Sequence, residues 1–156
     1  MPNFKTLDAR IPAPVIALTI GLAMKGAVLA IGLRVDPSTW RMQLGVALSQ
    51  LSALIALAAL WTLWRARTTI NPMQPHRASR LVTAGIYRLS RNPMYLSLLL
   101  LLSAYALRID AVLTWLGPLA FWAYVTRFQI LPEERVLADK FGPAYRDYRH
   151  RTRRWL

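Results

Sequence analysis

The side chains best suited to chemistry gather in two polar motifs. The first spans residues 85–95 and contains Tyr87, Arg91, Asn92 and Tyr95. If a helix begins here, a guanidinium, an amide and two phenols would suit an anionic ligand group, because free N–H groups and the dipole at a helix start favour anions. The alternative is structural. Asparagine is a favoured N-cap and proline is favoured directly after it, so Asn92-Pro93 could serve only to start a helix.

The second motif begins at Pro132 and continues through residues 141–148. Glu133 and Glu134 could accept hydrogen bonds from hydroxyl or amino groups, or face a cationic centre. They could equally be first-turn acids of a helix that starts at Pro132, or members of an ion-pair network among the many arginines. Gly142 and the proline after it are expected to stop that helix.

Four apolar blocks must position these motifs. The chain has 156 residues, of which 55% are hydrophobic, and the first two blocks are long enough as helices to cross a hydrocarbon core of about 30 Å. The sequence therefore predicts an all-α integral membrane bundle of about four transmembrane helices plus a cytosolic C-terminal helical segment. One domain covers 1–156. The expected spans are 11–33, 42–64, 93–107 and 111–131, and the expected cofactor segments are 71–95 and 132–150.

The basic residues are distributed unevenly around these blocks. The net charge is +13, and most of the 20 Lys and Arg residues precede the first block, fill the central loop or follow the last block. Only Arg34, Arg41 and Arg108 fall on the opposite side. The positive-inside rule then places both termini and both motifs in the cytoplasm. This topology accounts for the charge, so a nucleic-acid partner is not expected.

A few remaining residues narrow the chemistry. The chain has no cysteine, which excludes disulfides and thiolate ligands, and nothing else predicts a metal site. His76 and His150 are expected to be solvated or interfacial. Lys25, the one charge deep in a block, is expected to snorkel or to bond a carbonyl group. The arginine-rich run 149–154 is expected to contact anionic head groups.

The two motifs together carry a family resemblance. The string from Leu81 to Tyr95, a hydrophobic hairpin, Glu133-Glu134 and the segment from Phe141 to Tyr148 resemble the isoprenylcysteine carboxyl methyltransferase family. The related phospholipid methyltransferases share this pattern. The resemblance covers about half of the chain, and the first two blocks match only as generic hydrophobic helices.

The resemblance implies S-adenosylmethionine as methyl donor, in a cytosolic pocket roofed by the C-terminal segment. It further implies a lipid bilayer, here expected to be a bacterial inner membrane, and a hydrophobic or lipid-like methyl acceptor reached from it. The loop from Pro72 to Gln74 is an additional candidate contact. The cofactor contacts carried over by position are Ser79, Arg80, Leu81, Val82, Tyr87, Asn92, Pro93, Met94, Tyr95 and Glu133.

Two departures from the family pattern concern the acceptor. Eukaryotic members have histidine at the position of Asn92, and an arginine near the acceptor at the position of Gln129. Arg127 is close in sequence, but in an α-helix it points about 160° away from Gln129. A prenylcysteine carboxylate is therefore disfavoured as acceptor. The residues expected near the reacting groups are Arg91, Gln129 and Arg127.

Two other functions remain open on the sequence. One is a small four-helix transporter; proton-coupled examples need an acidic residue within a span, and the four blocks contain neither Asp nor Glu, although Lys25 keeps this alternative open. A catalytically inactive relative of the family is the other alternative, and the departures at Asn92 and Gln129 are the reason to consider it.

Overall fold

The computed structural model describes residues 11–32, 38–67 and 80–156, and within these ranges every regular element is helical. Ser79, His76 and the loop from Pro72 to Gln74 lie outside the described residues. The longer helices are α1 (Ala13–Ala30), α2 (Thr39–Arg65), α3 (Pro93–Ile109), α4 (Leu116–Val125) and α5 (Leu131–Arg151). The short elements are the 3-10 helices η2 (Gly85–Arg88) and η3 (Val112–Trp115) and the π-helix η4 (Thr126–Ile130).

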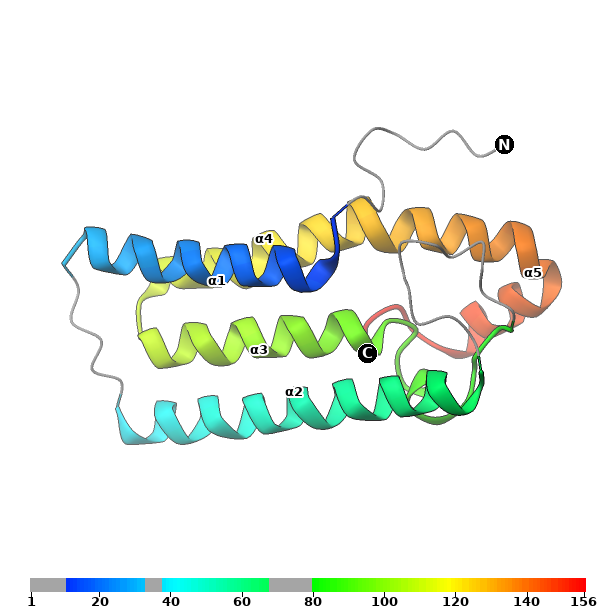
Figure 1. Ribbon diagram of the computed structural model, residues 1–156, viewed down its shortest axis with the longest axis horizontal. Helices are drawn as coiled ribbons and strands as arrows, with labels where there is room; N and C mark the ends of the chain where they lie inside the picture. The colour runs from blue at the N-terminus through cyan, green and yellow to red at the C-terminus, as the bar shows by residue number, and fades with distance from the viewer. Residues whose placement is uncertain (1–10, 33–37, 68–79) are drawn as a thin grey trace.

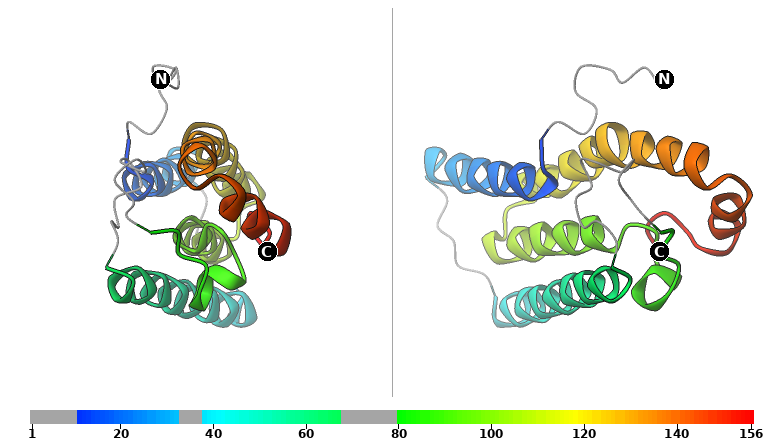
Figure 2. Two further views of the ribbon diagram at one scale, coloured as in Figure 1. Left: turned by 90° about the vertical axis from the view of Figure 1, so that its right-hand side faces the viewer. Right: turned by 45° about the vertical axis from the view of Figure 1, so that its right-hand side comes forward.

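Helix α3 is the centre of the bundle. It packs against α1, α2 and α4, and Figure 2 shows it between α2 on one side and the layer of α1 and α4 on the other. The core joins Tyr95 and Leu102 of α3 to Met24 of α1 and Phe121 of α4. Helix α3 is therefore packed on several sides, and its first residues, which belong to the first polar motif, are fixed by this packing.

The outer surface of the bundle is apolar. Helices α1 and α2 are long and apolar enough to cross a membrane, and α3 is a shorter apolar helix. Leu54, Leu57, Trp61 and Trp64 of α2 are all exposed. A helix that is apolar on its outer as well as its inner face is suited to lipid rather than to water. The structure thus supports membrane association with two candidate spans, where the sequence predicted four.

The fourth predicted span, 111–131, is divided into three elements. It contains η3, α4 and η4, and the helical path then continues without a break into α5. The predicted helix is confirmed, since α5 begins at Leu131 with Pro132 in its first turn, but no break separates it from the helical turns before it. Proline has no N–H to donate and its ring crowds the preceding turn, so the wide π-turn at Thr126–Ile130 accommodates Pro132 inside one continuous path.

Two glycines shape the segments around the site. Gly142 has φ +51° and ψ −120° and breaks the helical path there, as predicted, before a second helical segment that ends at Arg151. Gly85 has φ +59°, and a Cβ at this position would lie 2.8 Å from Thr62 Oγ1 of α2. Gly85 therefore allows the first motif to lie directly against the end of α2.

After α5 the chain folds back on itself. We call residues 152–156 the C-terminal tail; Figure 1 shows it returning from the end of α5 to the start of α3. We call this end of the bundle the tail end. The opposite end, where α3 finishes, η3 begins, α1 ends and α2 starts, is the hairpin end.

Candidate functional site

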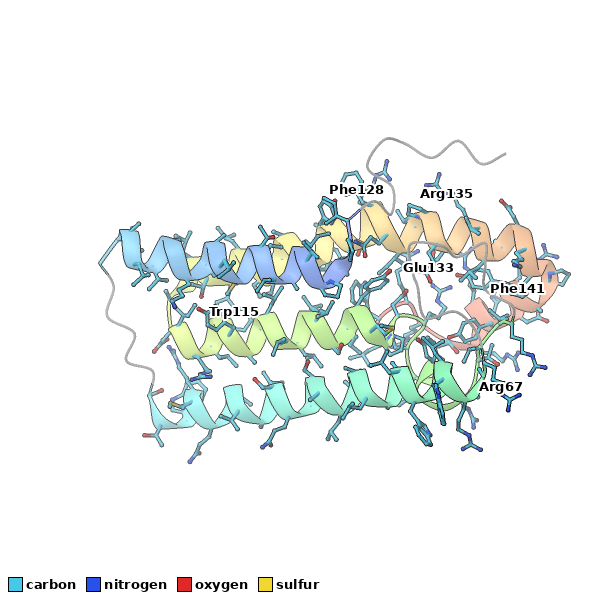
Figure 3. All side chains as sticks on the ribbon, viewed as in Figure 1. Arg67, Trp115, Phe128, Glu133, Arg135 and Phe141 are labelled. Atoms are coloured by element: carbon cyan, nitrogen blue, oxygen red, sulfur yellow. The ribbon has the colours of Figure 1, made fainter. Side chains whose placement is uncertain are left out.

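A phenol and a carboxyl from the two motifs meet at the tail end. Tyr95 lies in the first turn of α3 and Glu133 in the first turn of α5. The Tyr95 hydroxyl donates a hydrogen bond to Glu133 Oε2 at 3.3 Å. In Figure 3, Glu133 points from α5 toward the interior, whereas Phe128 and Arg135 point away from it. The continuous path through η4 sets this orientation.

The environment of Glu133 changes its protonation. Burial raises the pKa of Glu133 to about 7; the hydrogen bond from Tyr95 lowers the pKa and the neighbouring Glu134 raises it. Burial, followed by the charge of Glu133, also raises the pKa of Tyr87 far above its usual value. Near neutral pH the carboxyl is thus divided between its two forms, while the Tyr87 phenol keeps its proton.

The second acid, Glu134, lies between two arginines. Arg91 Nη2 is 3.0 Å from Glu134 Oε1. Arg154 of the tail donates through Nε to Oε1 at 3.0 Å and through Nη2 to Oε2 at 2.8 Å, a bidentate pair. The side chains of Arg91 and Glu134 are each only 9% exposed. The two adjacent acids therefore have different tasks: Glu134 is fully engaged by cations and Glu133 is not.

Arg91 has donors to spare. Its Nε and Nη1 atoms are buried and have no hydrogen-bond partner among the described residues. The indole Nε1 of Trp155, in the tail, is likewise buried without a hydrogen-bond partner among the described residues. An unpartnered buried donor costs free energy, so such groups in a folded protein usually have a partner such as water or a ligand. A buried guanidinium with two unpartnered nitrogen donors is suited to a carboxylate or a phosphate.

The tail is bonded to the start of α3. The backbone N–H of Arg91 donates to the Arg153 carbonyl at 3.0 Å, and Asn92 Nδ2 donates to the Arg154 carbonyl at 2.9 Å. Ser90 Oγ reaches the same Arg154 carbonyl at 3.4 Å. Asn92 holds the N-cap position of α3, as predicted, but its side chain makes no capping bond. Its amide binds the tail instead.

The tail contacts bear on the arginine-rich run 149–154, which the sequence predicts to contact lipid head groups. The Arg154 side chain binds Glu134, whereas Arg149, Arg151 and Arg153 are exposed and their contact with head groups stays a prediction. A further bond from Tyr148 to the Tyr87 carbonyl at 2.7 Å fastens the end of α5 to the first motif. Sequence reasoning missed Arg154 and Ser90. No periodic pattern marks the tail, and its partners lie far away in the chain.

The other predicted cofactor contacts vary in position. Pro93 is fully buried at the start of α3, and Met94 beside it is half-buried. Leu81 and Val82 are half-buried in the segment that approaches η2, and Arg80 is exposed. These residues therefore belong to the approach to the tail end, while Tyr95, Arg91 and the half-buried Glu133 form its inner part.

Gln129 and Arg127, both expected near the acceptor, face different neighbours. The Gln129 amide is buried and donates to the Ile11 carbonyl at 2.7 Å, which fixes the chain just before α1. Arg127 lines a cavity of about 480 Å³ with six other residues, which are Leu131, Glu134, Arg135, Ala138, Arg149 and Arg154. Gln129 thus has a structural bond, and Arg127 belongs to a strongly basic cavity on the α5 side.

Comparisons of the sequence with known proteins give a family match and a relative. The sequence model described as phospholipid methyltransferase matches residues 40–144, from α2 into α5, so it includes Tyr95, Arg91 and both acids. The match also includes α2, which the sequence alone treated as a generic hydrophobic helix. An uncharacterized protein of Haemophilus influenzae is 49% identical over 63 residues, which are 40% of this chain and 100% of that protein. Because the family match spans well over half of its length, this chain belongs to the phospholipid methyltransferase family.

Proposed function

We propose that this chain is a membrane methyltransferase that moves a methyl group from S-adenosylmethionine to a hydrophobic or lipid-like acceptor. The acceptor arrives from the bilayer and the cofactor from the cytoplasm of a bacterium, with both termini and the tail end on the cytoplasmic side of the inner membrane. Membership of a methyltransferase family, the apolar surfaces of α1 and α2 and the uneven basic charge support this proposal.

The observation that carries the proposal is the pairing of two unlike groups at one helix start. Arg91 offers two unpartnered buried N–H groups, and Glu133 lies against Tyr95 with a carboxyl that Glu134's arginines do not neutralise. S-adenosylmethionine carries a carboxylate and a cationic sulfonium, which supplies an activated methyl group. In this proposal Arg91 holds the carboxylate, and Glu133 with Tyr95 holds a hydroxyl, an amino group or the cationic centre.

The chain's own residues then do three things. Arg91, Tyr95 and Glu133 fix the position of the donor, which is the main requirement of an in-line displacement. The tail, tied to Arg91 and Asn92, excludes water from that position. With a pKa near 7, Glu133 can also accept a proton if the acceptor is an amine, whereas a carboxylate acceptor needs no base.

Cofactor binding tests the site. We expect Glu133→Ala and Tyr95→Ala each to abolish S-adenosylmethionine binding, measured by titration calorimetry in detergent, without unfolding the protein. Asp139→Ala is the matched control, because Asp139 is an exposed acid on the same helix. Unchanged affinity in both site variants, with normal circular dichroism, would contradict the site.

Turnover tests the reaction. We expect wild-type protein to move labelled methyl groups from the cofactor into a membrane lipid extract. One observation favours a non-catalytic relative: the chain's own tail already occupies the Asn92 amide and the Arg91 backbone N–H. Binding without transfer to any lipid fraction would support that alternative. Solute flux in proteoliposomes, with no cofactor binding, would support a transporter.

A further inference from the structure

The hairpin end contains a second cavity, far along the bundle from the tail. Its volume is about 430 Å³, and α1, α2 and α3 all contribute to it. The polar lining comes from Lys25, Tyr105 and Arg108, and the apolar lining includes Val28, Met42 and Ile109. The cavity therefore combines two cations and a phenol with walls that suit a hydrocarbon chain.

The two cations have no anionic partner in the part of the chain that the structure describes. Arg108 lies against Gly45 of α2, where it makes a packing contact through its stem. Asp110 is the one acid that the described residues place at this end, and it pairs with Arg41, which is not part of the cavity lining. Cations beside apolar walls favour an anion that itself carries an apolar part.

The depth of the cations points to one class of ligand. Lys25 precedes the last residue of α1 by about 7.5 Å along the helix, and Arg108 is next to the last residue of α3. In a bilayer spanned by α1, both positive groups then lie near the boundary between hydrocarbon and head groups. Lipid phosphates occupy this depth, and long basic side chains extend toward it.

We propose that this cavity binds a phospholipid with net negative charge. Its phosphate is held by Lys25 and Arg108 with a hydrogen bond from Tyr105, and an acyl chain lies along the exposed apolar faces of α1 and α2. A zwitterionic head group is disfavoured, because its ammonium needs an anionic partner and Asp110 is already paired with Arg41. This lipid site is separate from the tail end and does not depend on the proposed methyl transfer.

Lipid binding by the detergent-purified full chain tests the proposal. We expect native mass spectrometry and thermal unfolding to show stronger binding and a larger rise in Tm with phosphatidylglycerol than with phosphatidylcholine of the same chains. Soluble glycerol phosphate should give no shift, which separates a lipid head group from a free phosphate. Diacylglycerol should also give none, since it lacks the charge.

Variants locate the binding. Lys25→Met and Arg108→Met keep the bulk of each stem and remove its charge, so each should weaken phosphatidylglycerol binding roughly fivefold. Arg108→Lys should restore most of it. Arg65→Gln, an exposed cation at the end of α2, is the charge control and should change nothing. Equal loss in Arg65→Gln, or equal affinity of the wild type for both lipids, would overturn the proposal.

Discussion

The two ends of the bundle treat charge in opposite ways. At the tail end, Arg91 and Glu134 are buried and Arg154 joins them, so the charges lie among protein atoms. At the hairpin end, the ion pair of Arg41 with Asp110 is partly exposed at both members, with side-chain exposures of 36% and 28%. Buried ion pairs are costly to break and specify geometry, whereas exposed pairs contribute little. Positional precision is therefore concentrated at the tail end.

The comparison extends to unpartnered groups. The open donors of the tail end are fixed within a network that includes Glu134, and they suit a small polar ligand of defined shape. Lys25 and Arg108 at the hairpin end have long stems beside apolar walls, which suits a mobile and chemically simple ligand such as a lipid. One end thus resembles a specific site and the other a membrane anchor.

Glu134→Gln should have the largest effect, because it leaves two guanidiniums without a charge partner at the tail end. We expect the free energy of unfolding in detergent to fall by about 3 kcal/mol, as for other buried pairs that lose one member. Denaturant unfolding followed by tryptophan fluorescence measures it. Asp139→Asn, at an exposed position of α5, should change stability little. A loss below about 1 kcal/mol would remove the contrast between the ends.

Stability should also depend on pH through Glu133. Its pKa is about 7 in the folded protein against an ordinary value of 4.5. Below pH 4.5 both states hold the proton. Between 4.5 and 7 only the folded state retains it, so the free energy of unfolding falls as pH rises and is constant above about pH 7. A tenfold difference in proton affinity corresponds to roughly 1.4 kcal/mol, and Glu133 is only half-buried, so we expect a total fall of about 2 kcal/mol.

The control for this pH dependence is Glu133→Gln, which should abolish the slope between pH 4.5 and 7. Asp110→Asn at the hairpin end should leave it in place. If the slope survived in Glu133→Gln, another group would be responsible and the Glu133 carboxyl would not distinguish the tail end.

Asn92→Asp separates two roles of one side chain. Aspartate is as good an N-cap as asparagine, so a capping residue would tolerate the change. A carboxylate cannot donate to the Arg154 carbonyl, so loss of the tail contact should cost about 1 kcal/mol, equal to or more than Asn92→Ala. Unfolding free energies, together with protease sensitivity of the C-terminus, measure this. Full stability in Asn92→Asp would show that the tail contact contributes nothing.

Asp110→Asn should have the smallest effect. Asparagine tolerates the left-handed backbone at this position, where φ is +56°, so the change removes only the ion pair with Arg41. We expect less than about 1 kcal/mol by thermal unfolding, and still less at high salt. A loss as large as that of Glu134→Gln would mean that the two ends do not differ.

The sequence predicted the parts of the site that depend on local pattern. Asn92-Pro93 marks the start of α3, and the order of motifs around a hairpin led to Tyr95 and Glu133 at one end of the bundle, where they are in contact. It also predicted the break at Gly142. The ligand roles of these residues stay predictions. Helix starts and hairpins follow from propensity and periodicity, which one sequence displays.

The remaining features depend on distant partners. The tail is irregular, and no periodic pattern in the sequence predicts where it folds. Its contacts include the bond from Asn92 to Arg154 and the bidentate pair of Arg154 with Glu134. Gln129 likewise bonds the chain before α1. The preference of proline for a helix start predicts the first turn of α5 at Pro132, but it does not predict the wide turn that joins α5 to α4 without a break. Such outcomes are decided by packing rather than local preference.

Because the helical path runs through the wide turn at Thr126–Ile130 without a break, the number of residues in this stretch sets the direction in which the side chains of α5 point. Loss of one residue there would turn everything downstream by about 100°, and Glu133 would then point away from α3. Loops at either end of the bundle can lengthen without such a penalty. Homologous sequences should therefore lack insertions and deletions at residues 126–132, even where they carry substitutions there.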